Sequence, residues 1–313
     1  MHLTGEFFQE MLVLYSIALL GFIARRIGIL NENANDVFTQ LILYITLPAL
    51  ILFSLDLPFS FTLFREFLWL VSMSVYVLVA SIFLAGWMRK RSRLPEKQKV
   101  VYEGLIIFGN QGFIGYAVTY ILLGDQGIVY LTIFNLFYLL LIWTYGIHLF
   151  SKKNDVINWK TIFLNPGILS TLTGLLIFLL PIGWPTVISD GLEMVGKMTI
   201  PLSMIIIGSF LANVGTPALF LASVKNSALW KMAFAKLLLI PLLLLPFLAI
   251  SAPFALLFIA VVVSGMPAAP TISLYAQKYE ADSYFASVGV LLTTLLCMVS
   301  IPFLYMLLHF IAH

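Results

Sequence analysis

The sequence predicts an all-α polytopic membrane protein, with ten transmembrane helices arranged as a 5+5 inverted repeat and with broken helices four and nine crossing. Three observations predict this class. Long apolar runs recur along the chain, glycine and proline interrupt two of them, and these interruptions recur at nearly the same spacing in both halves. The 313 residues are 61% hydrophobic and only 10% charged, whereas soluble domains are about 25% charged.

Ten apolar runs are long enough to cross a bilayer as helices, which takes about 20 residues. Their connections are short, so no soluble domain is expected. The predicted spans cover residues 6–24, 36–54, 66–88, 101–123, 127–150, 166–183, 189–212, 228–250, 253–276 and 285–310.

Basic residues outside the predicted spans lie almost entirely in the odd-numbered connections, most densely at 89–99, whereas the even-numbered connections hold only Arg65. Because cytoplasmic loops carry an excess of Lys and Arg, the odd-numbered connections are predicted to be cytoplasmic. We therefore expect a multi-pass protein of the plasma membrane with both termini outside the cytoplasm. The basic stretch is interpreted as a membrane anchor, and no nucleic-acid partner is expected.

Two pairs of segments indicate the internal repeat. YITLPALIL (44–52) and KMTIPLSMI (197–205) share a Thr-apolar-Pro motif, and the interrupted segment IFGNQGFIGY (107–116) precedes a second one, SGMPAAPTIS (264–273), by nearly the same spacing. The second span therefore corresponds to the seventh, and the fourth to the ninth.

The two halves must enter the membrane from opposite sides, because each contains an odd number of spans. The predicted organisation is a first repeat at 1–150, a short cytoplasmic link at 151–165 and a second repeat at 166–313. Interrupted helices at corresponding places in inverted repeats are typical of the binding sites of secondary transporters.

The interruptions are expected to meet near the bilayer midplane, because Asn110 and Gly265 each lie well inside a span at about 1.5 Å per residue. Loose backbone groups are tolerated there only against protein or a polar cavity. The N-terminus of each restarted half-helix attracts negative charge. The breaks therefore favour an anionic ligand such as a carboxylate.

The predicted substrate-binding residues lie at the breaks and at the repeated threonine motifs. Asn110 is favoured for direct contact, whereas Gln111 is equally open to substrate contact and to capping of loose backbone. Lys197 is open to a substrate role and to an ion pair with Glu193, four residues earlier. The predicted substrate-binding set is Thr46, Gly109, Asn110, Gln111, Gly112, Lys197, Thr199, Met266, Pro267 and Thr271, and the crossover or hinge set is Pro48, Gly115, Pro201, Gly265 and Pro270.

The balance of charge inside the spans also favours an anion. Lys197 and Lys236 are placed deeper than any Asp or Glu, and none of the acids is expected at midplane depth. Ionisable residues inside spans are functional candidates by default. Lys236 is interpreted mainly as a supporting residue and is not placed in the predicted site.

Several stretches resemble the auxin efflux carrier family, in the form of its bacterial members. They are FGNQGFIGY, GDQG (124–127), NPG (165–167), IPLSMIIIGSFL (200–211), MPAAPTISLYAQKY (266–279) and TTLLCMVSIPFLYML (293–307). The resemblance implies interleaved scaffold and transport subdomains, crossing helices four and nine, elevator-type alternating access and an architecture like that of bile-acid sodium symporters. It also implies a homodimer that forms through the scaffold side.

The predicted function is secondary transport of a small organic anion, a mono- or dicarboxylate such as malate or malonate. An exporter of auxin-like aromatic acids and a non-transporting ligand sensor on the same fold are the alternatives. Enzymatic activity, a metal site and a cofactor are not expected, because neither His-Glu-x-x-His nor Gly-x-Ser-x-Gly occurs in the sequence. Coupling to Na⁺ or H⁺ and the direction of transport are left open.

Overall fold

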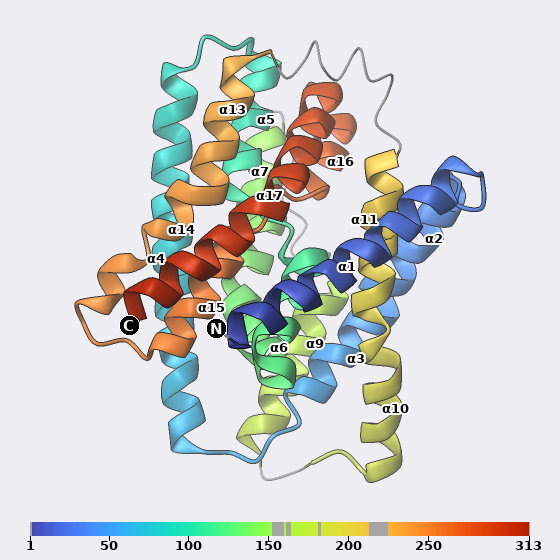
Figure 1. Ribbon diagram of the computed structural model, residues 1–313, viewed down its shortest axis with the longest axis vertical. Helices are drawn as coiled ribbons and strands as arrows, with labels where there is room; N and C mark the ends of the chain where they lie inside the picture. Colours follow the sequence, from blue (N-terminus) through green and yellow to red (C-terminus); the bar gives the residue numbers. More distant parts are fainter. Residues whose placement is uncertain (1, 152–159, 161–163, 181–182, 213–224, 313) are drawn as a thin grey trace. The chain divides into compact units, whose positions relative to one another are not determined.

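The computed structural model describes residues 2–151, 160, 164–180, 183–212 and 225–312, and these residues are predominantly helical (Figure 1). Within them there is no β-strand, and one isolated antiparallel bridge joins Gly109 and Ala268. The predicted all-α class is therefore confirmed for the part of the chain that the structure describes.

Six helical segments among the described residues are long and apolar enough to cross a membrane. Pro166–Leu179 and Phe254–Ser264 are shorter apolar helices. A multi-pass membrane protein is thus confirmed, whereas the count of ten spans stays a prediction. The six long segments are Glu32–Ser54, Phe61–Arg91, Gln111–Phe150, Thr186–Ala212, Ser227–Ala249 and Ser283–Ile311.

The longest of these segments bends at Gly124, whose φ of 59° and ψ of −141° are not helical. Glycine adopts positive φ without the steric cost that a Cβ brings. Two helices therefore meet at Gly124 within α6 (Tyr116–Leu141), close to the place where the sequence predicts the connection between its fourth and fifth spans.

The chain forms two compact units, and each draws on both halves of the sequence. Unit 1 comprises Met1–Leu68, Gly112–Leu136 and Trp159–Asn213. Unit 2 comprises Trp69–Gln111, Phe137–Asn158 and Val214–His313. Among the described residues, the chain passes from one unit to the other in α4 (Phe61–Arg91), between Gln111 and Gly112, and in α6.

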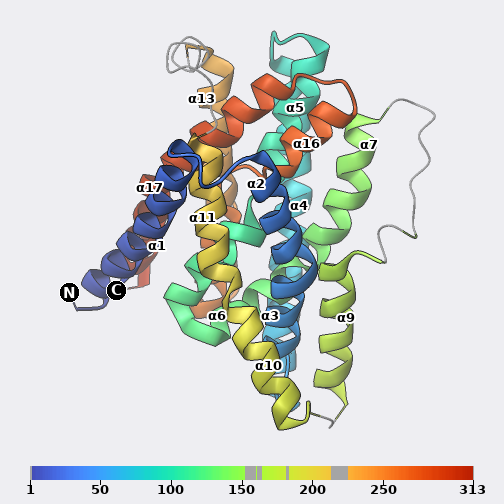
Figure 2. The same cartoon turned by 90° about the vertical axis from the view of Figure 1, so that its right-hand side faces the viewer.

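Unit 1 is built around the packing of α1 on α11, which lie side by side (Figure 2). A Cβ at Gly21 or Gly208 would collide with the backbone of the facing helix, so these two glycines permit the close approach. The described helices that begin and end in unit 1 are α1 (His2–Arg26), α2 (Glu32–Leu41), η1 (Ile42–Thr46), α3 (Leu47–Ser54), α9 (Pro166–Leu179), α10 (Thr186–Lys197) and α11 (Thr199–Ala212).

Unit 2 surrounds α5 (Glu96–Ile107) with helices from the C-terminal third of the chain. Within α5, the Glu103 carboxylate is buried and accepts hydrogen bonds from Arg89 at 2.8 Å and from the Tyr145 hydroxyl at 2.6 Å. The other described helices that begin and end in unit 2 are η3 (Ile142–Gly146), α7 (Ile147–Phe150), α13 (Ser227–Phe234), η4 (Ala235–Leu239), α14 (Ile240–Leu242), η5 (Leu245–Leu248), α15 (Phe254–Ser264), α16 (Thr271–Lys278) and α17 (Ser283–Ala312).

Four short segments in the described part of the chain are π-helical, namely η1, η2 (Gln111–Gly115), η3 and η4. Single π-helical turns within α-helices occur frequently at functional sites. Here η1 ends at Thr46, η2 begins at Gln111 and η4 contains Lys236, so three of the four contain residues singled out from the sequence.

Candidate functional site

The first helix break follows α5. The helix ends at Ile107, and Phe108 adopts an extended conformation with φ −94° and ψ 120°. Gly109 and Asn110 are also non-helical, and helical structure resumes at Gln111. The interruption therefore lies at the glycine-asparagine pair that the sequence indicated.

The second break separates α15 from α16. α15 ends at Ser264, and α16 begins at Thr271 after Pro270. Proline has no amide hydrogen and its ring clashes with the preceding turn, so Pro267 and Pro270 prevent the helix from continuing. Met266 and Ala268 in the gap are fully buried.

The two breaks lie against each other and are joined through their backbones. The Asn110 amide donates to the Pro267 carbonyl at 2.6 Å, and the Ala269 amide donates to the Phe108 carbonyl at 3.0 Å. These bonds flank the antiparallel bridge between Gly109 and Ala268. Because all these residues belong to unit 2, this pairing is internal to one compact unit.

Two hydroxyl groups bond to the backbone of the bridged pair. The Tyr138 hydroxyl donates to the Gly109 carbonyl at 2.6 Å. The Thr293 hydroxyl accepts from the Ala268 amide at 3.0 Å and donates to the Gly289 carbonyl at 2.9 Å. Helix breaks leave backbone groups without helical partners, and these hydroxyls supply two replacements.

Lys236, on η4, is a charged side chain beside the first break. It is 1% exposed, and its Nζ lies 3.4 Å from the Ile107 carbonyl at the end of α5. No carboxylate forms an ion pair with it in the described part of the chain. The carbonyls at a helix C-terminus carry partial negative charge, which stabilises the buried ammonium.

Because Gly109 has no side chain, the end of the Lys236 side chain can lie next to it. A Cβ at position 109 would lie 3.0 Å from the Lys236 Nζ, so the end of the lysine side chain would have to shift by a few tenths of an ångström. The depth of Lys236 is readable from the sequence, but its contact with the first break is not, because its partner is a backbone carbonyl 129 residues away.

Asn110 and Gln111 are both buried, each with 4% of its surface exposed. The Gln111 Oε1 atom has no hydrogen-bond partner in the described structure. A buried polar atom without a partner costs about 1–3 kcal/mol, and such atoms are uncommon in native proteins. Gln111 therefore offers an unused acceptor immediately after the first break.

The repeated threonines meet in unit 1. Thr199 donates a hydrogen bond to Thr46 at 2.9 Å, and both side chains are buried. Lys197 lies two residues earlier, and its Nζ is 2.5 Å from Glu193 Oε1, with each side chain 39% exposed. The structure shows the ion pair between Lys197 and Glu193, and a substrate role for Lys197 stays a prediction.

The predicted site residues thus fall into two groups. Those in unit 2 are Gly109, Asn110, Gln111, Gly265, Met266, Pro267, Pro270 and Thr271; those in unit 1 are Thr46, Pro48, Gly112, Gly115, Lys197, Thr199 and Pro201.

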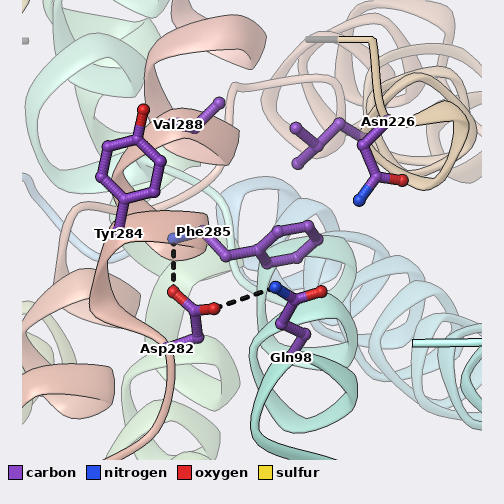
Figure 3. A pocket seen from close by; sticks show the side chains of 7 residues that line it. Gln98, Asn226, Asp282, Tyr284, Phe285 and Val288 are labelled. Carbon is purple, nitrogen blue, oxygen red and sulfur yellow. Dashed lines mark hydrogen bonds between the residues drawn. The ribbon is translucent and has the colours of Figure 1, made fainter. Parts of the chain in front are cut away.

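Unit 2 also contains a cavity of about 260 Å³ where α5, α13 and α17 begin. Asp282 accepts hydrogen bonds there from Gln98 at 2.9 Å and from the Phe285 amide at 2.8 Å (Figure 3). The predicted site includes none of its lining residues, which are Gln98, Asn226, Leu229, Asp282, Tyr284, Phe285 and Val288. The cavity forms a feature distinct from the paired breaks.

Comparison with known proteins gives two findings. A family described as membrane transport protein matches residues 6–305. An uncharacterized transporter of the archaeon Methanocaldococcus jannaschii is 26% identical over 212 residues, which cover 63% of this chain and 66% of that protein. The chain thus matches just under two thirds of the length of this relative.

Proposed function

Since the chain belongs to the membrane transport protein family, which is the auxin efflux carrier family that its motifs resemble, we propose that it is a secondary transporter of a small organic anion. The substrate class is a mono- or dicarboxylate such as malate or malonate. The anion is held at the paired helix breaks and crosses the plasma membrane by elevator-type alternating access.

One observation carries this proposal: two broken helices are joined backbone to backbone beside a buried ammonium. The ends of broken helices present loose amides and carbonyls, which lipid does not tolerate. A transporter uses these groups at its binding site. In this chain, Asn110, the unpaired Gln111 acceptor and Lys236 all lie at or next to the first break.

The charges at the breaks support an anionic substrate. Lys236 contributes a positive charge when its amine is protonated, and α16, which restarts at Thr271, directs the positive end of its dipole toward the second break. The described residues place no carboxylate in an ion pair with Lys236. A carboxylate bound at the breaks would supply the negative charge that pairs with Lys236.

The Thr46–Thr199 pair supports the proposed 5+5 inverted repeat. In a repeat related by a two-fold axis, equivalent residues touch each other only where the axis passes between them. Thr46 and Thr199 occupy equivalent positions in the repeated motif, and they are hydrogen bonded. We take this pair to lie on that axis.

The two compact units support the elevator mechanism, because each contains segments from both halves of the chain. We assign the transport role to unit 2, which contains the paired breaks, and the scaffold role to unit 1, through which two copies pair. Both termini are placed outside the cytoplasm, because the basic end of α4 marks the cytoplasmic side.

Uptake by purified protein in liposomes tests the function. Radiolabelled malate, malonate and an aromatic acid are offered to the wild type and to Asn110→Ala, with Asn31→Ala as control, since Asn31 caps an exposed helix end. Saturable uptake of a carboxylate is expected, with a loss of about tenfold in Asn110→Ala alone, as for one hydrogen bond to a charged group. Binding of carboxylates without any flux would overturn transport in favour of a sensor.

A further inference from the structure

The antiparallel pairing of the two breaks is very short. The two backbone bonds that join the segments are made by Asn110 and Ala269, which flank the bridged residues Gly109 and Ala268. In such a pair, the peptide groups of the bridged residues point away from the partner segment. Each hydrogen bond contributes only about 0.5–1.5 kcal/mol net, so these two bonds alone hold the register weakly.

The outward-facing Gly109 carbonyl and the outward-facing Ala268 amide are each hydrogen bonded to one side-chain hydroxyl. Tyr138, on α6, donates to the Gly109 carbonyl at 2.6 Å, and its ring packs edge-on against Phe108 with centroids 6.0 Å apart. Thr293, on α17, accepts from the Ala268 amide at 3.0 Å. Both side chains are buried, so water does not readily replace either hydroxyl.

We propose that Tyr138 and Thr293 are positioning residues, which attach the two broken segments to α6 and α17 and thereby set the geometry of the substrate site. This inference rests on the proposed function. The two hydroxyls act through the backbone of Gly109 and Ala268, because in the described part of the chain their hydrogen bonds all go to backbone atoms. Removal of either hydroxyl shifts the segment that presents Asn110.

The variants are Tyr138→Phe and Thr293→Val, which remove a hydroxyl and keep the shape of the side chain. Thr293→Ser restores the hydroxyl and serves as the rescue. Thr294→Val is the matched control for threonine, since the Thr294 hydroxyl donates within its own helix, to the Val290 carbonyl, and has no other hydrogen bond to the described residues. Tyr130→Phe is the control for tyrosine, since that hydroxyl donates to the Glu66 carboxylate and accepts from Gln126, all within unit 1.

The first readout is amide hydrogen exchange of the purified protein in lipid nanodiscs, measured on peptides that cover 108–110 and 267–269. Exchange is expected to rise about tenfold in Thr293→Val and Tyr138→Phe, as for the loss of roughly 1.4 kcal/mol. The rescue and both controls keep wild-type exchange. Equal exchange in Thr293→Val and Thr294→Val would overturn the inference.

The second readout is the concentration dependence of malate uptake. The KM is expected to rise about fivefold in both variants, with the maximal rate retained, because the site is misplaced by the loss of about one hydrogen bond. Thr293→Ser keeps the wild-type KM. An unchanged KM in both variants would overturn the inference, whereas absence of uptake by the wild type would overturn only the proposed function, since the exchange result does not depend on transport.

Discussion

Thr199 donates a hydrogen bond to Thr46 across 2.9 Å, although the two residues are 153 positions apart. Both are buried, with 0% and 1% of their surfaces exposed. Each begins the same Thr-apolar-Pro motif, once in each half of the chain. The contact therefore joins the two halves at an equivalent position.

Replacement of both threonines by valine is predicted to cost less stability than the sum of the two single changes. Each single change leaves one buried hydroxyl without its partner, at about 1–3 kcal/mol, whereas the double change removes both hydroxyls together. A double-mutant cycle on unfolding of the detergent-solubilised protein measures this coupling. Strict additivity would show that the two hydroxyls do not stabilise each other.

Replacement of Lys236 by methionine is predicted to lower uptake by about tenfold or more, because a hydrogen-bonded charge is worth about 1.5–3 kcal/mol. The carbonyl end of α5, where Lys236 lies, is the kind of place at which transporters coordinate a cation. Because the ammonium already occupies it, uptake is expected to be independent of sodium. Lys231→Met, an exposed lysine one turn earlier, is the control.

Sodium and potassium gradients of equal size, imposed in turn on the same liposomes, measure this dependence. A requirement for sodium in the wild type would contradict the role given to Lys236.

Replacement of Lys197 by glutamine is predicted to change the KM for uptake by less than about twofold, as is usual for a half-exposed ion pair. Lys197 pairs with Glu193, and both side chains are 39% exposed. Glu193→Gln should therefore have the same small effect. Loss of uptake in Lys197→Gln but not in Glu193→Gln would show that the lysine acts on the substrate.

Replacement of Gln111 by leucine is predicted to leave thermal stability unchanged or to raise it, while uptake falls about tenfold. The Gln111 Oε1 atom is buried without a partner, so its removal relieves a cost of about 1–3 kcal/mol. The control, Gln98→Leu, should instead lower the melting temperature, because Gln98 donates to Asp282. A destabilised Gln111→Leu with normal uptake would assign this residue to structure alone.

The features predicted correctly from the sequence are those set by residues close together in the chain. Gly109, Pro267 and Pro270 interrupt apolar runs, and the local chemistry of glycine and proline places the breaks there. The pair of Glu193 and Lys197 follows from helical spacing.

The features that the sequence did not predict depend on side chains that bond to groups far away in the chain, most of them backbone groups. Lys236, Tyr138 and Thr293 all contact peptide groups of the breaks. Because every residue has a peptide group, the sequence does not show which one a side chain will contact. The bond between Gln98 and Asp282 spans 184 positions and follows no motif. Such contacts appear only once the chain is folded.

Binding of a carboxylate for transport is proposed to take place at the paired breaks. Its most direct test is the initial rate of radiolabelled malate or malonate uptake by liposomes that contain the wild type, Asn110→Ala, Lys236→Met or Asn31→Ala. Saturable uptake is expected in the wild type and in Asn31→Ala, and losses of about tenfold in the two variants at the first break. Wild-type rates in both of those variants would contradict it.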